Sequence, residues 1–256
     1  MDWQQPPKNL AISSQEIHVW RANLDLASEQ IADLTQTLSP DEIDRANRFR
    51  FPIHKNRFIA ARGRLRQILG RYLQIAPQEV EFAYSDRGKP FLKQQQLQFN
   101  VSHTEDIALY AFTPQQVIGI DLEYLGKETE YKQIAQRFFT PAEAELINNA
   151  KPPDCKRLFY HLWTVKEAYL KAIGSGLVGG LDNLEVEVAN LNCRDLELQN
   201  SPEIKIVKID DPSVKEEDWS CHNLVMPSQF IATLVVKSDR QSLTIRQFFL
   251  NHYLHS

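Results

Sequence analysis

Apolar residues recur at helical spacing in two long segments of the chain. The first segment is residues 55–73, in which Leu65 and Leu69 stand four apart on one face. The second is residues 157–174, RLFYHLWTVKEAYLKAIG, and its last residue, Gly174, suits the C-cap of a helix. The pattern therefore predicts two long amphipathic helices.

A similar motif precedes each of these helices. Ser39 and Thr140 are each followed by proline and then, three residues after the hydroxyl, by glutamate, Glu42 and Glu143. In such a capping box the hydroxyl and the carboxylate accept hydrogen bonds from backbone N–H groups that the first helical turn leaves without partners. Both motifs predict the start of a helix.

Strand patterns follow each long helix. Short apolar or alternating segments occur at 79–84, 97–102, 107–112 and 117–123, and again at 184–189, 204–209 and 230–236. The order helix, helix, strands therefore occurs twice. We expect an α+β protein of two similar, pseudo-twofold halves, residues 1–116 and 117–256, each with a long helix packed on a small, mainly antiparallel sheet.

The composition is that of a globular protein with few cysteines. The chain has 256 residues, of which 43% are hydrophobic and 24% are charged. Its cysteines, Cys155, Cys193 and Cys221, are odd in number and form no CxxC pair, which argues against a disulfide framework or a cysteine zinc site. The sequence shows neither a signal-peptide pattern nor a run of about 18 apolar residues. We expect a soluble, cytoplasmic protein with no membrane contact.

Positive charge is concentrated in one segment. Residues 45–71 contain nine Lys or Arg residues and no acidic residue, although the chain as a whole has a net charge of −4. Such a segment indicates an anionic partner at one place. A solvated basic helix face is the common alternative, and phosphate, nucleic acid and an acidic protein all remain candidates.

The sequence GIDLE places two carboxylates on one face of a predicted strand. Asp121 and Glu123 are two residues apart, so both side chains face the same way, while Ile120 and Leu122 face the opposite, buried side. Adjacent like charges repel unless a cation lies between them, and oxygen ligands suit Mg²⁺. The pair predicts a magnesium site, and an ordinary solvated strand face is the alternative.

The second long helix could supply a third carboxylate. Trp163, Glu167 and Lys171 are four residues apart and share a helix face. If this face meets the strand at 117–123, Glu167 becomes a metal ligand and Lys171 lies ready for a phosphate. A salt bridge between Glu167 and Lys171 would equally explain the helix in isolation. Lys166 is better explained as a structural or surface residue than as a catalytic one.

Two further motifs lie on the strand side of the first half. DRGKP, residues 86–90, has the composition of a turn with Lys89 near its tip. NVSH ends a predicted strand with Ser102 and His103. A lone histidine is usually structural, so His103 gains a functional interpretation only if other phosphate-binding groups lie beside it.

Taken together, these motifs resemble those of the 4'-phosphopantetheinyl transferases, in particular the long, surfactin-synthetase type with two pseudo-symmetric halves. The matching stretches are RGKP, FNVSH, IGIDLE, RFFTPAE and FYHLWTVKEAYLKAIGSGL. The resemblance extends from the first capping box to about Gly180, and the remainder matches mainly in its strand pattern. The combination of GIDxE with WxxKEAxxK is specific, whereas either motif alone is only suggestive.

The resemblance implies a reaction and a catalytic centre. Such enzymes transfer the 4'-phosphopantetheine arm of coenzyme A to a serine of an apo carrier protein, acyl or peptidyl, and release 3',5'-ADP in fatty acid, polyketide or nonribosomal peptide biosynthesis. By this resemblance Asp121, Glu123 and Glu167 hold Mg²⁺ against the pyrophosphate, and Lys171 contacts the phosphates. Glu167, or a metal-bound water that it orients, is the implied general base.

The resemblance also implies a coenzyme A pocket. Lys89, Ser102 and His103 would line it, and the backbone around Lys89 and Pro90 would lie near the adenine. The first half would form the 3'-phosphate and adenine side, and the second half the metal and catalytic side. Family members often carry a base where this chain has Glu42, and Arg45 can substitute. Our candidates for the 3'-phosphate ligands are Arg57 and Arg62.

Two other functions explain part of the sequence. A nucleic-acid-binding module would use residues 45–71, but it leaves the carboxylates at 121, 123 and 167 unexplained. A catalytically silent homologue that only binds carrier protein would have no need of these carboxylates and Lys171. We therefore expect a monomeric, active transferase whose partners are coenzyme A and an acidic carrier protein, with no nucleic acid.

Overall fold

The computed structural model describes residues 3–94, 97–151, 154–176, 180–189, 203–237 and 243–250. The elements of the first half are β1 (Glu16–Asn23), α1 (Ser28–Thr35), α2 (Pro40–Asn47), α3 (Pro52–Leu73), η1 (Pro77–Glu79), β2 (Phe82–Tyr84), β3 (Pro90–Leu92), β4 (Gln98–Thr104) and β5 (Ile107–Thr113). Those that follow are β6 (Val117–Tyr124), α4 (Tyr131–Phe138), α5 (Pro141–Asn149), α6 (Asp154–Ile173), η3 (Leu181–Asn183), β7 (Leu184–Ala189), β8 (Glu203–Ile209), η4 (Glu216–Asp218), β9 (Trp219–Asn223), β10 (Phe230–Lys237) and β11 (Thr244–Leu250).

Both predicted capping boxes are present. The backbone N–H of Ser39 donates to Oε2 of Glu42 at 3.0 Å, and that of Thr140 donates to Oε2 of Glu143 at 2.9 Å. The C-cap prediction is also confirmed, since α6 ends one residue before Gly174, whose φ of 71° is readily adopted by glycine. These local signals mark the starts of α2 and α5 and the end of α6.

The same order of elements occurs twice along the chain. One strand, three helices and four strands run from β1 to β5, and the order recurs from β6 to β10. The strand orders β1–β5–β4 and β6–β10–β9 correspond, as do the hairpins β2–β3 and β7–β8. The predicted α+β class with small, mainly antiparallel sheets is confirmed. The sequence patterns did not predict β1, α1, β3, α4, β9 or β11. Strand β11 pairs in parallel with β1, in the sheet of the first half.

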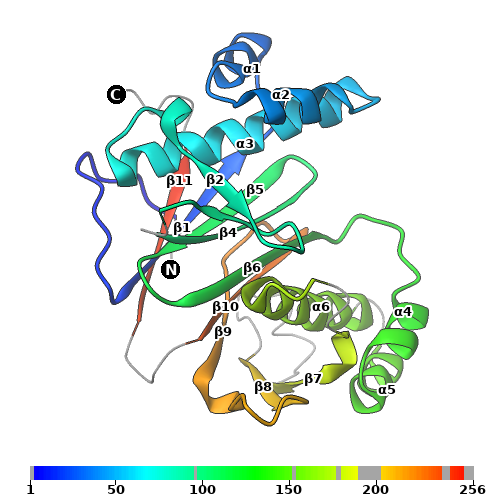
Figure 1. Cartoon of the computed structure of the whole chain (residues 1–256). Coiled ribbons are helices and arrows are strands. Elements are labelled where there is room, and N and C mark those ends of the chain that lie inside the picture. Colours follow the sequence, from blue (N-terminus) through cyan, green and yellow to red (C-terminus); the bar gives the residue numbers. More distant parts are fainter. Residues whose placement is uncertain are drawn as a thin grey trace.

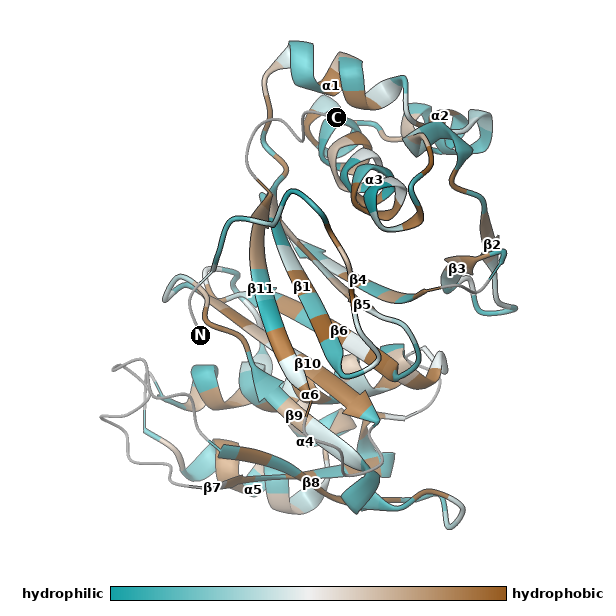
Figure 2. Ribbon diagram, turned by 90° about the vertical axis from the view of Figure 1, so that its left-hand side faces the viewer, coloured by the Kyte–Doolittle hydropathy of each residue, from teal (hydrophilic) through white to brown (hydrophobic). Residues whose placement is uncertain are grey.

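The two larger sheets, β11–β1–β5–β4 and β6–β10–β9, lie between the long helices α3 and α6 (Figures 1 and 2). Trp20 and Ala22 of β1 face the core under α3, whereas Ile17 and Val19 face a second core that lies between the sheets. Strands β6 and β10 turn one face toward this second core and the opposite face toward α6. The arrangement is therefore helix, sheet, sheet, helix.

The sheets meet along a seam between β4 and β6. The backbone N–H of Ile120 donates to Oδ1 of Asn100 at 3.0 Å, and that of Leu122 donates to Oγ of Ser102 at 3.1 Å. Side chains of β4 thus satisfy backbone donors at the edge of β6, which would otherwise be buried without partners. The seam places the end of β4 beside Asp121.

The remaining global expectations concern cysteines and membranes. Cys155 and Cys221 are free, and Cys193 lies outside the described residues. Over the described part of the chain, no helix combines the length and the apolar character that crossing a membrane requires.

Candidate active site

The carboxylates of β6 face α6, as the alternation of the strand predicted. Asp121 is buried, with 4% of its surface exposed, and Ile120 and Leu122 point into the opposite core. The helix lies directly on the strand because residue 119 is glycine. A Cβ atom at Gly119 would lie 1.8 Å from the carbonyl oxygen of Ala168. The glycine of GIDLE is therefore required for the close approach of the two elements.

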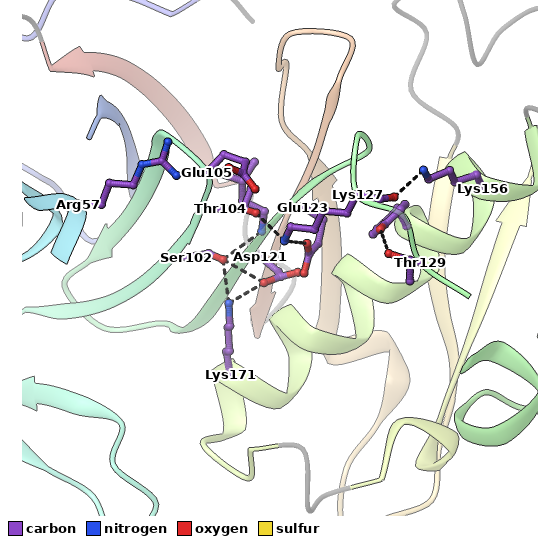
Figure 3. Close-up of polar contacts among 12 residues, drawn as sticks. Arg57, Ser102, Thr104, Glu105, Asp121, Glu123, Lys127, Thr129, Lys156 and Lys171 are labelled. Carbon is purple, nitrogen blue, oxygen red and sulfur yellow. Dashed lines mark hydrogen bonds and ion pairs between the residues drawn. The ribbon is translucent and has the colours of Figure 1, made fainter. Parts of the chain in front are cut away.

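Lys171 joins α6 to the strand and the seam (Figure 3). Its Nζ lies 2.6 Å from Oδ1 of Asp121 and donates to Oγ of Ser102 at 2.9 Å. The Ser102 hydroxyl in turn donates to Oδ1 of Asp121 at 3.0 Å, so its hydrogen-bonding capacity is filled. Lys171 pairs with Asp121, and no ion pair joins it to Glu167, although both residues are described. The alternative of a local salt bridge within the helix is not observed.

Glu167 lies in an acidic and partly buried environment. Burial and the charges of Asp121 and Glu123 raise the pKa of its carboxyl to about 7, despite the opposing effect of Lys171. Its Oε1 and the Oδ2 of Asp121 are buried without a hydrogen-bond partner. Buried carboxylate oxygens without partners are costly, so the site favours a bound cation or proton.

Glu123 lies at the outer end of this acidic cluster. Burial and the charge of Asp121 raise its pKa. The Nζ of Lys127 lies 3.3 Å from its Oε2 and donates to Oγ1 of Thr104 at 2.9 Å (Figure 3). Lys127 is a second ammonium beside the carboxylates, and the sequence motifs did not identify it.

The donor set fits a hard divalent cation. Carboxylate oxygens are the ligands that Mg²⁺ prefers, and one or two of them commonly suffice because the substrate's phosphates complete its coordination. The orphaned oxygens of Asp121 and Glu167 meet this requirement. Among the residues that the structure describes, no three His, Cys, Asp or Glu side chains form a group that could hold a metal as they stand. The two oxygens without partners, on Asp121 and Glu167, are the groups that would hold a cation here.

A cleft of about 220 Å³ adjoins Lys171. The turn between β2 and β3 forms one wall and bonds to the end of α6: Nζ of Lys89 donates to the carbonyl of Ala172 at 2.9 Å, and Arg87 donates to that of Ser175. Burial lowers the pKa of Lys89. The cleft thus brings together Lys89, Pro90 and Lys171, which the sequence predicted as site residues. It also includes residues that the motifs did not identify. Its lining residues include Arg87, Lys89, Pro90, Asn100, Lys171 and Gly174.

His103 lies on the opposite side of β4 from the seam and is exposed. Partial burial of its ring and the charges of Lys171, Arg45 and Lys127 lower its pKa. Arg45, which belongs to α2, therefore acts electrostatically on β4. Lys171, Arg45 and Lys127 are close enough to His103 to act on its charge, as a role in phosphate binding requires.

The structure places the two arginines predicted for the 3'-phosphate on acidic side chains. Arg57 bonds to Oδ1 of Asp25 at 2.7 Å and lies 3.3 Å from Glu105. Arg62 lies 3.3 Å from the buried Glu42 and stacks over the ring of Phe82. Both arginines are thus engaged by the protein and are not brought to the carboxylates of β6.

Lys166 is a structural residue, as predicted. It is fully buried, its Nζ lies 2.9 Å from Oε2 of Glu143, and it also donates to the carbonyl of Leu181 at 2.7 Å. The lysine of the WTVKEA motif therefore anchors α6, and its neighbour Glu167 faces the site.

Fold and site together define an α+β protein whose buried carboxylates favour a bound cation. A cleft lined by Lys89 and Lys171 lies beside them and suits a substrate that carries phosphate. The comparisons with known proteins specify this class. Residues 117–222 match the 4'-phosphopantetheinyl transferase superfamily, and residues 22–115 match the N-terminal domain of 4'-phosphopantetheinyl transferases. The chain belongs to this superfamily and is a 4'-phosphopantetheinyl transferase.

Several relatives carry the same designation. The chain is 43% identical to the 4'-phosphopantetheinyl transferase HetI of Nostoc sp. over 211 residues, which are 81% of this chain and 88% of HetI. It is 32% identical over 164 residues to a phosphopantetheinyl transferase of Thraustochytrium sp., 59% and 57% of the two chains. It is 27% identical over 217 residues to the L-aminoadipate-semialdehyde dehydrogenase-phosphopantetheinyl transferase of Homo sapiens, 80% and 69%.

Proposed function

We propose that the protein transfers the 4'-phosphopantetheine group of coenzyme A to a serine of an apo carrier protein in a Mg²⁺-dependent reaction, as a two-halved enzyme of the surfactin-synthetase type. One observation carries the proposal. Glu167, with a pKa of about 7 and a buried oxygen without a partner, lies next to the ion pair of Asp121 and Lys171. A titratable carboxyl group (Glu167), an ammonium group (Lys171) and carboxylate oxygens without partners therefore lie together beside the cleft.

The roles of the residues follow from their contacts. Asp121 and Glu123, with one oxygen of Glu167, would hold Mg²⁺, which when bound would offset the charge of the pyrophosphate. Glu167 would accept the proton of the carrier serine, since a pKa near 7 leaves a sizeable carboxylate fraction at neutral pH. The serine oxygen bonds to the phosphorus that bears pantetheine, and the bond from that phosphorus to 3',5'-ADP breaks. Lys171 would stabilise the charge on the departing phosphate.

The coenzyme A pocket would be the cleft beside α6. Lys89 and Pro90 line it, Ser102 fixes Lys171 and Asp121, and His103 lies among cations on the neighbouring face. Arg57 and Arg62 would reach a 3'-phosphate only by giving up their acidic partners. Arg45 is exposed and forms no ion pair with any described residue, so we favour it for this role.

The 3'-phosphate assignment can be tested with two substrates. We expect Arg45→Ala to raise the KM for coenzyme A by about tenfold and to leave the KM for 3'-dephospho-coenzyme A unchanged, because a charge-assisted bond to one phosphate is lost. Arg62→Ala serves as the comparison. If Arg62→Ala discriminates between the two substrates and Arg45→Ala does not, the original assignment to Arg62 is correct.

The activity itself is tested by incubating the protein with coenzyme A, Mg²⁺ and several apo carrier proteins. Intact mass should show the addition of one phosphopantetheine group to a carrier, no addition in excess EDTA, and recovery on addition of Mg²⁺. Turnover in EDTA would contradict the metal assignment. Salt-sensitive binding to duplex DNA, without modification of any carrier, would favour a nucleic-acid-binding function instead.

A further inference from the structure

The corner between α2 and α3 presents apolar side chains to solvent. Residues 47–54, NRFRFPIH, are all exposed. Three of them are large and apolar: Phe49 is 39% exposed, Phe51 54% and Ile53 47%. Exposed large apolar residues are ordinary when single, whereas three within five residues of one exposed segment are the kind of cluster found at interaction sites. We name Arg48, Phe49, Arg50, Phe51 and Ile53 the corner patch.

The arginines of the corner patch are available, unlike most bases of the same segment. Arg57, Arg62 and Arg66 pair with carboxylates, and Arg71 donates to the carbonyl of Pro7. Arg48 and Arg50 form no ion pair with any residue of the described ranges, and Arg50 lies over the ring of Phe51. The corner patch therefore carries two bases without an acidic partner among the described residues, beside its exposed rings.

Residues that flank the corner patch connect it to the end of β4, where the active site begins. Arg45, one turn before it on α2, lowers the pKa of His103 on β4. Arg57, one turn into α3, pairs with Glu105 directly after β4, and Thr104 there accepts a hydrogen bond from Lys127 (Figure 3). A hollow of about 450 Å³ lined by Asp41, Arg45, Arg48 and Phe49 adjoins the patch. A protein seated on the patch would stand over the end of β4, beside the carboxylates.

We propose that the corner patch is the docking surface for the carrier protein, which would present an acidic helix with an apolar side chain; this inference rests on the proposed function. Arginine and aromatic residues together are the composition of interface cores. A second copy of this chain fits less well, because a twofold contact would place the same arginines opposite each other. Nucleic acid also fits less well, since it would leave Ile53 without a partner and would meet few unpaired bases.

The apolar part of the proposal can be tested by binding. The probe is an apo carrier whose modifiable serine is replaced by alanine, so that binding is measured without transfer. We expect the double variant Phe51→Ser and Ile53→Ser to weaken its Kd by roughly tenfold or more, as loss of interface anchors does. The control is Leu146→Ser with Val207→Ser, which alters apolar residues of similar exposure, 37% and 43%, on α5 and β8. Its Kd should equal that of the wild type.

The electrostatic part uses a charge reversal. Arg48→Glu with Arg50→Glu should raise the carrier KM and flatten its salt dependence, with the KM for coenzyme A unchanged. Lys132→Glu with Lys215→Glu, at exposed bases elsewhere, is the control. Thermal unfolding confirms that each variant is folded.

The outcomes separate the two proposals. Carrier binding that both corner-patch variants leave unchanged overturns the docking surface, even if the wild type transfers the group. Carrier binding that the variants weaken supports it, and if the wild type then fails to modify any carrier, the proposed transfer alone is overturned. Loss of duplex affinity, or of a concentration-dependent dimer, at unchanged carrier Kd assigns the patch to those partners and overturns the proposal.

Discussion

Helices α3 and α6 have equivalent places in the order of elements, and a buried base anchors each of them in the same way. Arg66 bonds to the capping-box Glu42 at 2.7 Å and donates to the carbonyls of Pro77 and Val80, around η1. Lys166 bonds to the capping-box Glu143 at 2.9 Å and donates to carbonyls around η3. The two long helices are therefore anchored in the same way.

The strand surfaces under the two helices differ completely. The third and fifth residues of β1 are His18 and Trp20, and both bond to the Tyr72 hydroxyl of α3, at 2.7 and 3.0 Å. The corresponding residues of β6 are Gly119 and Asp121. In the first half bulky rings fill the space under the helix. In the second half the helix backbone lies on the glycine, and one oxygen each of Asp121 and Glu167 is buried without a hydrogen-bond partner, which costs stability.

Helices α3 and α6 also differ in charge at one equivalent position. The residue after the anchoring base is Gln67 in α3 and Glu167 in α6. We expect Glu167→Gln to lower the rate of transfer by about 10²–10⁴-fold, the usual contribution of a general base, with the fold intact because the change is nearly isosteric. The reciprocal variant, Gln67→Glu, is the control and should transfer at the wild-type rate. Full activity of the Glu167 variant, measured by carrier mass, would remove Glu167 from the site.

Replacing the two anchoring bases, Lys166 and Arg66, should lower the free energy of unfolding by different amounts. Lys166→Met leaves Glu143 buried without a base and should lower the free energy of unfolding by about 3–5 kcal/mol. Arg66→Met should cost less, because Arg62 remains 3.3 Å from Glu42. Urea unfolding of both variants measures the difference. A greater loss for Arg66→Met would show that the carbonyl bonds, rather than the carboxylate, dominate the anchor.

The close approach of α6 to β6 can be disturbed by one methyl group. Gly119→Ala would place a Cβ atom 1.8 Å from a backbone oxygen, which no side-chain rotation relieves. We expect a loss of about 3 kcal/mol, at the upper end of the cost of overpacking, together with loss of transfer as Glu167 moves from Asp121. Unfolding that matches the wild type, with full activity, would mean that the helix has room to shift.

The smallest effect concerns pH in the second half. The pKa of Glu167 is about 7 in the folded protein and lies above its ordinary value of 4.5, so the folded state binds its proton more tightly than the unfolded state does. Stability from this group is therefore full below pH 4.5 and is lost as the pH rises to 7. In metal-free buffer the loss should be on the order of 1–2 kcal/mol, allowing for partial solvent exposure. Glu167→Gln should abolish this slope; an unchanged slope would assign it to another group.

Sequence patterns predicted those parts of the site that depend on local periodicity. The shared face of Asp121 and Glu123, the capping boxes and the end of α6 at Gly174 follow from strand alternation, cap chemistry and glycine conformation. Strand β1 was not predicted because its burial does not alternate. Four consecutive residues, 17–20, are buried, since one face packs under α3 and the other packs between the sheets. Arg87 belongs to the RGKP motif, but the motif predicted site roles for Lys89 and Pro90 alone.

The sequence by itself determined the two long helices, the capping boxes that start α2 and α5, the shared face of Asp121 and Glu123, and the family motifs, because each of these depends on residues close together along the chain. Only the tertiary structure decided that Lys171 pairs with Asp121 rather than Glu167, that Glu42 and Asp25 hold Arg62 and Arg57, and that β11 joins β1. Long charged side chains reach partners on several elements, and burial decides which partner is available. That choice depends on packing between segments tens of residues apart, which no local pattern records.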